Sequence, residues 1–171
     1  PRSTLSSSSA ASDVYKRQFY NYINGQGYAM GSLGPVYNRD LSHHQYGLRF
    51  TNDNGSSYLA ASQYDFCSQN GKNGNNTQYA SNGTNRVIFG YWNMSTSSGH
   101  SSHGEINFSN PANSSNYASV EWSIKYTDTS NIPVHTYGVG HYRQGTAMTG
   151  FQILPASGNI EAGIFTVYGI S

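Results

Sequence analysis

The sequence predicts an all-β fold, an antiparallel β-sandwich of about eight or nine strands with a jelly roll as the favoured arrangement. Only 10% of the residues are charged whereas 14% are aromatic, and tyrosine, glycine, asparagine and serine are abundant, as in strands joined by many turns. No apolar repeat at helical spacing persists for about three turns. The clearest pattern is strict alternation over residues 117–127, with one face formed by Val120, Trp122, Ile124 and Tyr126.

Residues 1–18 (PRSTLSSSSAASDVYKRQ) differ in composition from the rest of the chain. They form a Ser/Ala run followed by two basic residues, without the apolar stretch of a secretory signal or a membrane span. The segment resembles translated library-linker sequence, and a natural disordered arm has the same composition. We therefore expect a single β-sandwich domain at residues 19–171. If the segment is an assembly artefact, the natural first strand could be missing.

The first half of the domain is expected to contain strands at residues 18–23, 46–51 and 58–66. Residues 30–45 are expected to be irregular because two glycines and a proline interrupt them. Residues 52–55 (NDNG) predict a tight turn that pairs the second of these strands with the third. Residues 69–84 predict a long Asn/Gly loop, and long loops on a rigid scaffold often carry binding residues.

The second half predicts further strands at residues 85–92, 104–109, 117–127 and 134–142. The last 25 residues then predict a hairpin in which residues 151–154 (FQIL) pair with residues 164–170 (IFTVYGI) across a turn that starts at Pro155. Apolar side chains lie on both faces of the final strand. We therefore expect this strand to be buried from both sides and to seal the sheet.

Two segments of the second half carry a resemblance. The first segment consists of residues 156–160 (ASGNI) and 162–170 (AGIFTVYGI), and the second of residues 103–111 (HGEINFSNP) followed by Ser114-Ser115. The first resembles the C-terminal segment, and the second the middle segment, of a family of structural proteins of marine tailed bacteriophages. The resemblance covers residues 46–171. It implies a β-sandwich module of the virion or its tail.

The charge pattern limits the classes of partner. The formal net charge is +1 and the basic residues are scattered, so the sequence does not predict nucleic-acid binding. No apolar segment is long enough to predict membrane insertion. The single Cys67 permits no intramolecular disulfide and favours folding in a reducing compartment. Production in a bacterial host cytoplasm, followed by incorporation into a virion, fits these features.

Catalytic and metal-binding patterns are weak, and the sequence predicts no catalytic residue, metal or cofactor. The six histidines occur as an adjacent pair, an HxxH in a polar loop, and two residues about 20 Å apart along one strand, which do not fix a zinc geometry. Among the eight carboxylates, Glu105 and Glu121 are the one pair on neighbouring strands that would suit a glycosidase, and the alternative is that both face water.

Aromatic residues provide the candidate binding site. Tyr91 and Trp92 end a predicted strand, and Tyr79 lies in the predicted long loop, so the three could form a stacking platform for a sugar or a contact for another subunit. Two functions follow. The first is a noncatalytic structural module of a tailed-phage virion that forms a homo-oligomer by packing against other virion subunits. The alternative is a carbohydrate-binding sandwich that recognises a host-surface glycan.

Overall fold

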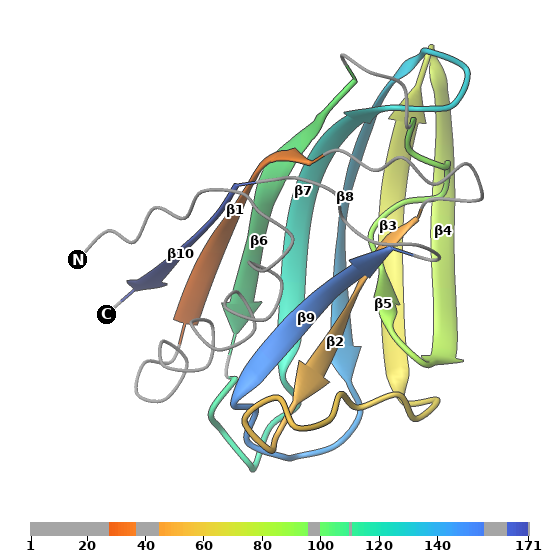
Figure 1. Ribbon diagram of the computed structural model, residues 1–171. Coiled ribbons are helices and arrows are strands. Elements are labelled where there is room, and N and C mark those ends of the chain that lie inside the picture. Colours follow the sequence, from red (N-terminus) through yellow and green to blue (C-terminus); the bar gives the residue numbers. More distant parts are fainter. Residues whose placement is uncertain (1–27, 37–44, 96–99, 110, 156–163, 171) are drawn as a thin grey trace.

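The computed structural model describes residues 28–36, 45–95, 100–109, 111–155 and 164–170. These residues form strands and turns without a helix, and the strands build two antiparallel sheets that pack against each other (Figure 1). The predicted all-β sandwich is therefore confirmed. The jelly-roll arrangement stays a prediction.

The larger sheet has seven strands in the order β10-β1-β6-β7-β8-β3-β4, and the smaller sheet has three in the order β5-β2-β9. The bounds in the larger sheet are β1 Tyr28–Val36, β3 Tyr64–Lys72, β4 Asn75–Thr84, β6 Ser102–Ser109, β7 Ser119–Thr127, β8 Pro133–Tyr142 and β10 Phe165–Ile170. Those in the smaller sheet are β2 Tyr46–Thr51, β5 Val87–Ile88 and β9 Gly150–Pro155. We call the face of the larger sheet that meets the smaller sheet its inner face, and the opposite face its outer face.

The alternation of β7 explains its place at the centre of the larger sheet. All four residues of its predicted core face are buried, whereas Glu121 and Lys125 on the other face are exposed. The one polar group of the Trp122 side chain is also hydrogen-bonded, because the indole Nε1 donates to the carbonyl oxygen of Phe89 at 2.9 Å. The indole lies against Gly138 of β8, where a Cβ would stand 2.6 Å from the ring, so only glycine fits this close approach.

The core between the sheets is aromatic. Phe50 of the smaller sheet stacks on Tyr64 of the larger one, with ring centroids 6.3 Å apart, and Phe108 stacks on Phe151 at 4.3 Å. The hydroxyl of Tyr64 accepts a hydrogen bond from the Phe50 backbone N–H and donates one to the carbonyl of Leu59, both at 2.9 Å. Burial raises the pKa of this phenol, as expected for a hydroxyl held in the core. These contacts tie the two sheets together.

The predicted hairpin at residues 52–55 is wrong. The turn exists, but β2 pairs with β5 and β9, whereas the next strand, β3, belongs to the other sheet. The Asp53 carboxylate organises the turn by accepting hydrogen bonds from the hydroxyls of Thr51 at 2.6 Å and Ser57 at 2.5 Å. A turn motif indicates a local reversal of the chain, but it does not indicate which sheet the following strand joins.

The predicted long loop at residues 69–84 is also wrong. These residues form most of the β3–β4 hairpin, whose turn is Asn73-Gly74 with φ values of 46° and 78°. Positive φ at both positions is the feature of the two-residue turns that suit hairpins, and Asn-Gly is their preferred sequence. The sequence does not predict these strands, because Asn, Gln and Thr replace the apolar residues that normally mark alternation.

The predicted C-terminal hairpin is not formed. β9 pairs with β2 in the smaller sheet, and β10 pairs with β1 at one edge of the larger sheet. Phe165 and Val167 pack against the core as the alternation predicts, but Ile164 on the other side is 48% exposed. Phe165, Thr166 and Val167 are all half-buried, so the expected full burial from both sides is not seen in the described part of this strand. The predicted turn falls mainly in residues 156–163, outside the described residues.

Two other boundaries differ from expectation. β1 is a strand in the region expected to be irregular, and its register with β6 shifts between Leu33 and Val36, close to the interrupting glycine and proline. Only Val87–Ile88 of the predicted strand at residues 85–92 pairs in a sheet. The predicted strand at residues 18–23 and the segment 1–18 lie outside the described residues.

Candidate functional site

The three predicted stacking residues come together in the structure. Tyr79 meets Tyr91 with ring centroids 5.4 Å apart, and Tyr91 meets Trp92 at the same distance, both edge to face. On its other side Tyr79 contacts the buried Phe66, with ring centroids 5.2 Å apart. We call Tyr79, Tyr91 and Trp92 the aromatic cluster. Its most accessible member is Tyr91, which is 46% exposed.

The members come from two parts of the fold. Tyr79 lies on the inner face of β4, opposite the buried Ser68 of β3. Tyr91 and Trp92 follow β5 in a segment whose backbone is fixed on both sides. Asn70 accepts a hydrogen bond from the Tyr91 N–H at 3.1 Å, and the Tyr126 hydroxyl donates to the Trp92 carbonyl at 2.8 Å. The cluster is therefore held in place before any ligand arrives.

Lys72 connects the aromatic cluster to the end of the larger sheet. Its Nζ lies 5.5 Å from the centroid of the Trp92 ring and forms an ion pair with the buried carboxylate of Asp128. Burial alone would raise the pKa of Asp128. The hydrogen bond and charge of Lys72, together with the backbone N–H groups of Ile132 and Ser130, outweigh burial and lower this pKa.

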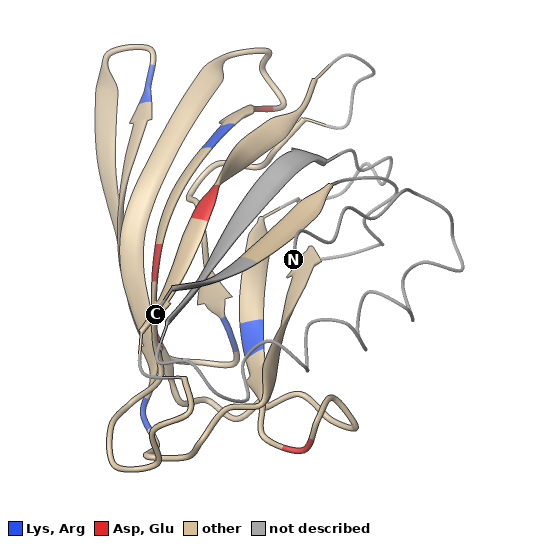
Figure 2. Cartoon of the chain, turned by 90° about the vertical axis from the view of Figure 1, so that its left-hand side faces the viewer, with Lys and Arg blue, Asp and Glu red and all other residues tan. Residues whose placement is uncertain are grey.

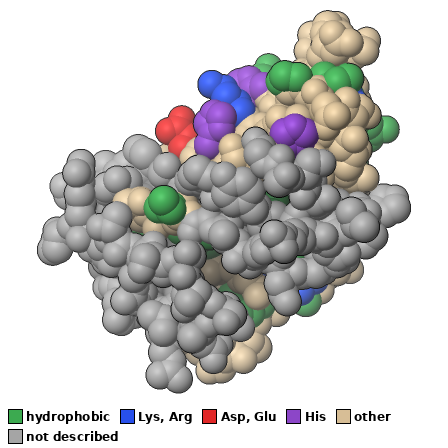
Figure 3. All heavy atoms as spheres, turned by 45° about the horizontal axis from the view of Figure 1, so that its top comes forward, with side chains coloured by type: hydrophobic (Ala, Val, Ile, Leu, Met, Phe, Trp, Pro, Cys, Tyr) green, Lys and Arg blue, Asp and Glu red, His purple; other side chains and the backbone are tan. Residues whose placement is uncertain are grey.

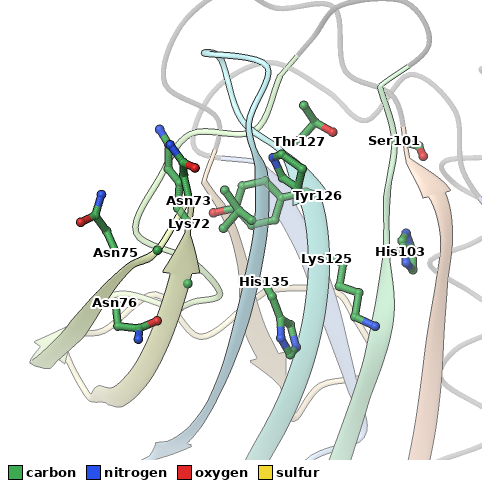
Figure 4. Close-up of a pocket in the computed structure, with 14 residues that line it drawn as sticks. Lys72, Asn73, Asn75, Asn76, Ser101, His103, Lys125, Tyr126, Thr127 and His135 are labelled. Carbon is green, nitrogen blue, oxygen red and sulfur yellow. The ribbon is translucent and has the colours of Figure 1, made fainter.

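A groove of about 630 Å³ lies on the other side of Lys72. Its floor includes outward-facing side chains of three adjacent strands, His103 of β6, Lys125 of β7 and His135 of β8. The β3–β4 hairpin, including Gly71 and Asn76, forms one wall (Figure 4). Charged residues are otherwise sparse and scattered over the chain (Figure 2). Histidine and basic side chains are nevertheless grouped, with one acidic side chain, on one part of the surface (Figure 3).

The structure also places the other residues considered for chemistry. Glu105 and Glu121 are both exposed on the outer face, and neither lines the groove. His100 is hydrogen-bonded to the Ser95 hydroxyl at 2.8 Å. Within the described ranges no group of three or more His, Cys, Asp or Glu side chains could hold a metal ion. His43 and His44 lie outside these ranges.

The structure reveals a polar cluster that the sequence analysis missed. On the outer face, Asp65 of β3 contacts His141 of β8 at 3.4 Å and Arg143 at 3.5 Å. Tyr117 stacks on His141 with ring centroids 5.5 Å apart. These residues are separated by up to about half of the chain, and only the β3–β8 register brings them together. No local motif could have identified them.

The fold and the site define an antiparallel β-sandwich that carries a fixed aromatic cluster beside a polar groove. No protein-family model, curated protein or solved structure matches the chain. The residues that the structure describes include no helix able to cross a membrane.

Proposed function

We propose that this chain is a noncatalytic recognition module that binds carbohydrate through the aromatic cluster. The observation that carries the proposal is the assembly of Tyr79, Tyr91 and Trp92 from two separate segments, with Tyr91 left 46% exposed. The apolar faces of sugar rings pack well on aromatic side chains, and a rigid platform loses little conformational entropy on binding.

Polar groups suited to sugar hydroxyls lie next to the cluster. Asn75 is exposed and is the cross-strand partner of Lys72, whose ammonium group lies near the Trp92 ring. The side-chain amide of Asn75, which can both donate and accept hydrogen bonds, is therefore carried by the cross-strand neighbour of the lysine that contacts Trp92. Apolar packing surfaces with a few convergent polar groups are the usual composition of small-ligand sites.

A glycan array probed with the full chain tests this proposal. We expect binding to a restricted set of glycans, and we expect Tyr91→Ala to weaken it by roughly tenfold through the loss of one stacking contact. Tyr117→Ala is the matched control, because Tyr117 is also an exposed tyrosine, at 51%, but belongs to the separate cluster around His141. Absence of glycan binding, or equal losses in both variants, would refute a carbohydrate site at the aromatic cluster.

A second candidate is a structural module of a tailed-phage virion, as the C-terminal resemblance implies. One structural observation favours it. Tyr137 and Val139 on the outer face of β8 are 53% and 54% exposed, and the exposed Cys67 of β3 is the cross-strand partner of Val139. Adjacent exposed apolar side chains on a sheet face are typical of subunit contacts. In this function the chain would be made in the bacterial host cytoplasm and would act as a homo-oligomer among other virion subunits.

Light scattering at several protein concentrations tests the second candidate. A stable trimer or higher symmetric oligomer of the full chain, converted to monomers by Val139→Lys, would support assembly through the outer face. A monomer at all concentrations would count against homo-oligomeric packing. Neither result bears on the glycan array, so the two functions are tested separately.

A further inference from the structure

We propose that the groove beside Lys72 is an oxyanion-binding site, with His103, Lys125 and His135 as the residues that bind a sulfate, phosphate or carboxylate group. The inference goes beyond the proposed carbohydrate function, because it concerns a different surface and does not require the aromatic cluster to bind.

The three side chains form a continuous row across the sheet. Lys125 is the direct cross-strand partner of His103 on one side and of His135 on the other. Directly opposed side chains on a sheet have their Cβ atoms about 4.5–5.5 Å apart, so one small anion can contact neighbouring members of the row. All three are exposed and line the groove (Figure 4).

Among the described residues no carboxylate forms an ion pair with the row, although Glu105 lies on the same outer face one cross-strand pair away. In the described part of the chain Lys125 forms no ion pair, and the carboxylate nearest in sequence on β6, Glu105, is opposite Ser123. Lys72 is neutralised by Asp128. A bound anion would therefore provide a partner for the Lys125 ammonium group, which has no ion pair among the described residues.

The geometry leaves space for the anion. The position that continues the row on β3 is Gly71, the partner of His135, and the position after it on β4 is Asn76. Gly71 places no side chain between His135 and the hairpin. A Cβ there would stand 3.3 Å from Oδ1 of Asn76, so the Asn76 amide borders this part of the groove and can supply a donor. The Ser123 hydroxyl is 3.0 Å from Nε2 of His135, which orients this ring and leaves Nδ1 for a ligand.

Binding should strengthen in mildly acidic solution, because protonated histidine has two N–H donors and a positive charge. The groups around the row do not reverse this expectation. Glu105 and Glu121 are the acidic side chains on β6 and β7, Asp65 on β3 is engaged by His141 and Arg143, and β4 carries no charged residue.

NMR titration of the isotope-labelled full chain tests the proposal. Sodium sulfate, a sulfated disaccharide and the matching unsulfated disaccharide are added separately at about pH 6 and about pH 8. We expect sulfate to shift amide signals of β6, β7 and β8 at the groove, with tighter binding at the lower pH. Lys125→Gln should weaken binding by roughly tenfold, as for the loss of one hydrogen bond to a charged group. His135→Gln should remove most of the pH dependence.

His141→Gln is the matched control, since it changes the same residue type on the same strand and face but outside the groove. Stronger binding of the sulfated sugar than of free sulfate would identify an acidic carbohydrate as the source of the oxyanion, whereas equal binding would identify a free ion. Shifts outside the groove, or unchanged binding in Lys125→Gln, would overturn the proposal. If only the unsulfated sugar binds, at the aromatic cluster, the carbohydrate proposal survives and the oxyanion site does not.

Discussion

At the scale of single residues, Lys72 combines two functions. It neutralises the buried Asp128, and its ammonium group lies near the Trp92 ring of the aromatic cluster. A buried carboxylate is tolerated only when it is paired and hydrogen-bonded, and Asp128 also accepts bonds from the Ser130 and Ile132 N–H groups at 2.9 Å. The stability of the turn after β7 and the position of the cluster therefore depend on one lysine.

Replacing Lys72 by methionine keeps most of the side-chain volume and removes the charge. We expect the free energy of unfolding to fall by about 2–3 kcal/mol, because a buried carboxylate loses its partner while Lys72 itself retains some exposure. Urea denaturation measures this change. Arg143→Met is the control, since the pair of Arg143 with Asp65 is more exposed and should contribute less than about 1 kcal/mol. Equal losses in the two variants would contradict the special position of Lys72.

Asp53 offers a residue-scale prediction about pH. The Ser57 hydroxyl, the Ser57 N–H and the Thr51 hydroxyl lower its pKa from 3.8 to about 2. A lowered folded-state pKa means that the contribution of Asp53 to stability is present above its ordinary value and is lost as the pH falls toward about 2. We expect Ser57→Ala to raise the pKa of Asp53 toward 3.8, as measured by NMR titration of the carboxyl carbon.

Ser56→Ala controls for the removal of a neighbouring serine. The Ser56 hydroxyl donates to the backbone carbonyl of Asp53 and not to its carboxylate, so this variant should leave the pKa of Asp53 in place. A similar pKa change in both variants would show that the hydroxyl of Ser57 is not the cause.

At the scale of elements, the β3–β4 hairpin contributes to both proposed binding surfaces, the aromatic cluster and the groove. It carries Tyr79 on the inner face and Gly71 and Asn76 at the wall of the groove. The hairpin depends on Asn73-Gly74, because a two-residue turn with this twist needs positive φ at both positions. The Asn- and Gly-rich composition that predicts a loop therefore builds the hairpin that carries Tyr79.

Gly74→Ala tests the turn. A Cβ at Gly74 would meet nothing within 4 Å, so any cost comes from the backbone conformation at φ 78° and not from a clash. We expect a loss of about 1 kcal/mol in the free energy of unfolding. Asn73→Gly should change stability by less than about 0.5 kcal/mol, because glycine also accepts positive φ. A neutral Gly74→Ala variant would mean that the hairpin closes through a different turn.

At the scale of the whole molecule, the two sheets are expected to unfold together. The chain alternates between them, since β2 and β9 lie in the smaller sheet whereas β1, β3 and β10 lie in the larger one. Phe50 is 1% exposed and contacts Tyr64 and Phe108 across the interface. Neither sheet can bury its apolar face without the other.

Phe50→Ala measures this coupling. We expect a loss of about 3–5 kcal/mol, the usual cost of truncating a buried phenylalanine. Unfolding is followed by two signals. Far-ultraviolet circular dichroism detects both sheets, and tryptophan fluorescence detects Trp122 in the larger sheet and Trp92 beside it. Both signals should give the same, lowered unfolding midpoint. Two separate midpoints would show that the smaller sheet unfolds independently.

Composition and alternation alone predict the all-β sandwich and its central strands, and they single out the aromatic residues of the candidate site. Both are properties of residues that lie close together in the sequence. The four apolar residues on one face of β7 are buried, as their alternation predicts. The tertiary structure decided which strands pair, and therefore that β2 and β3, like β9 and β10, lie in different sheets. Pairing depends on contacts between residues far apart in the chain, which a turn motif does not encode. The same reason explains why the row formed by His103, Lys125 and His135 becomes a site only when three strands are in register.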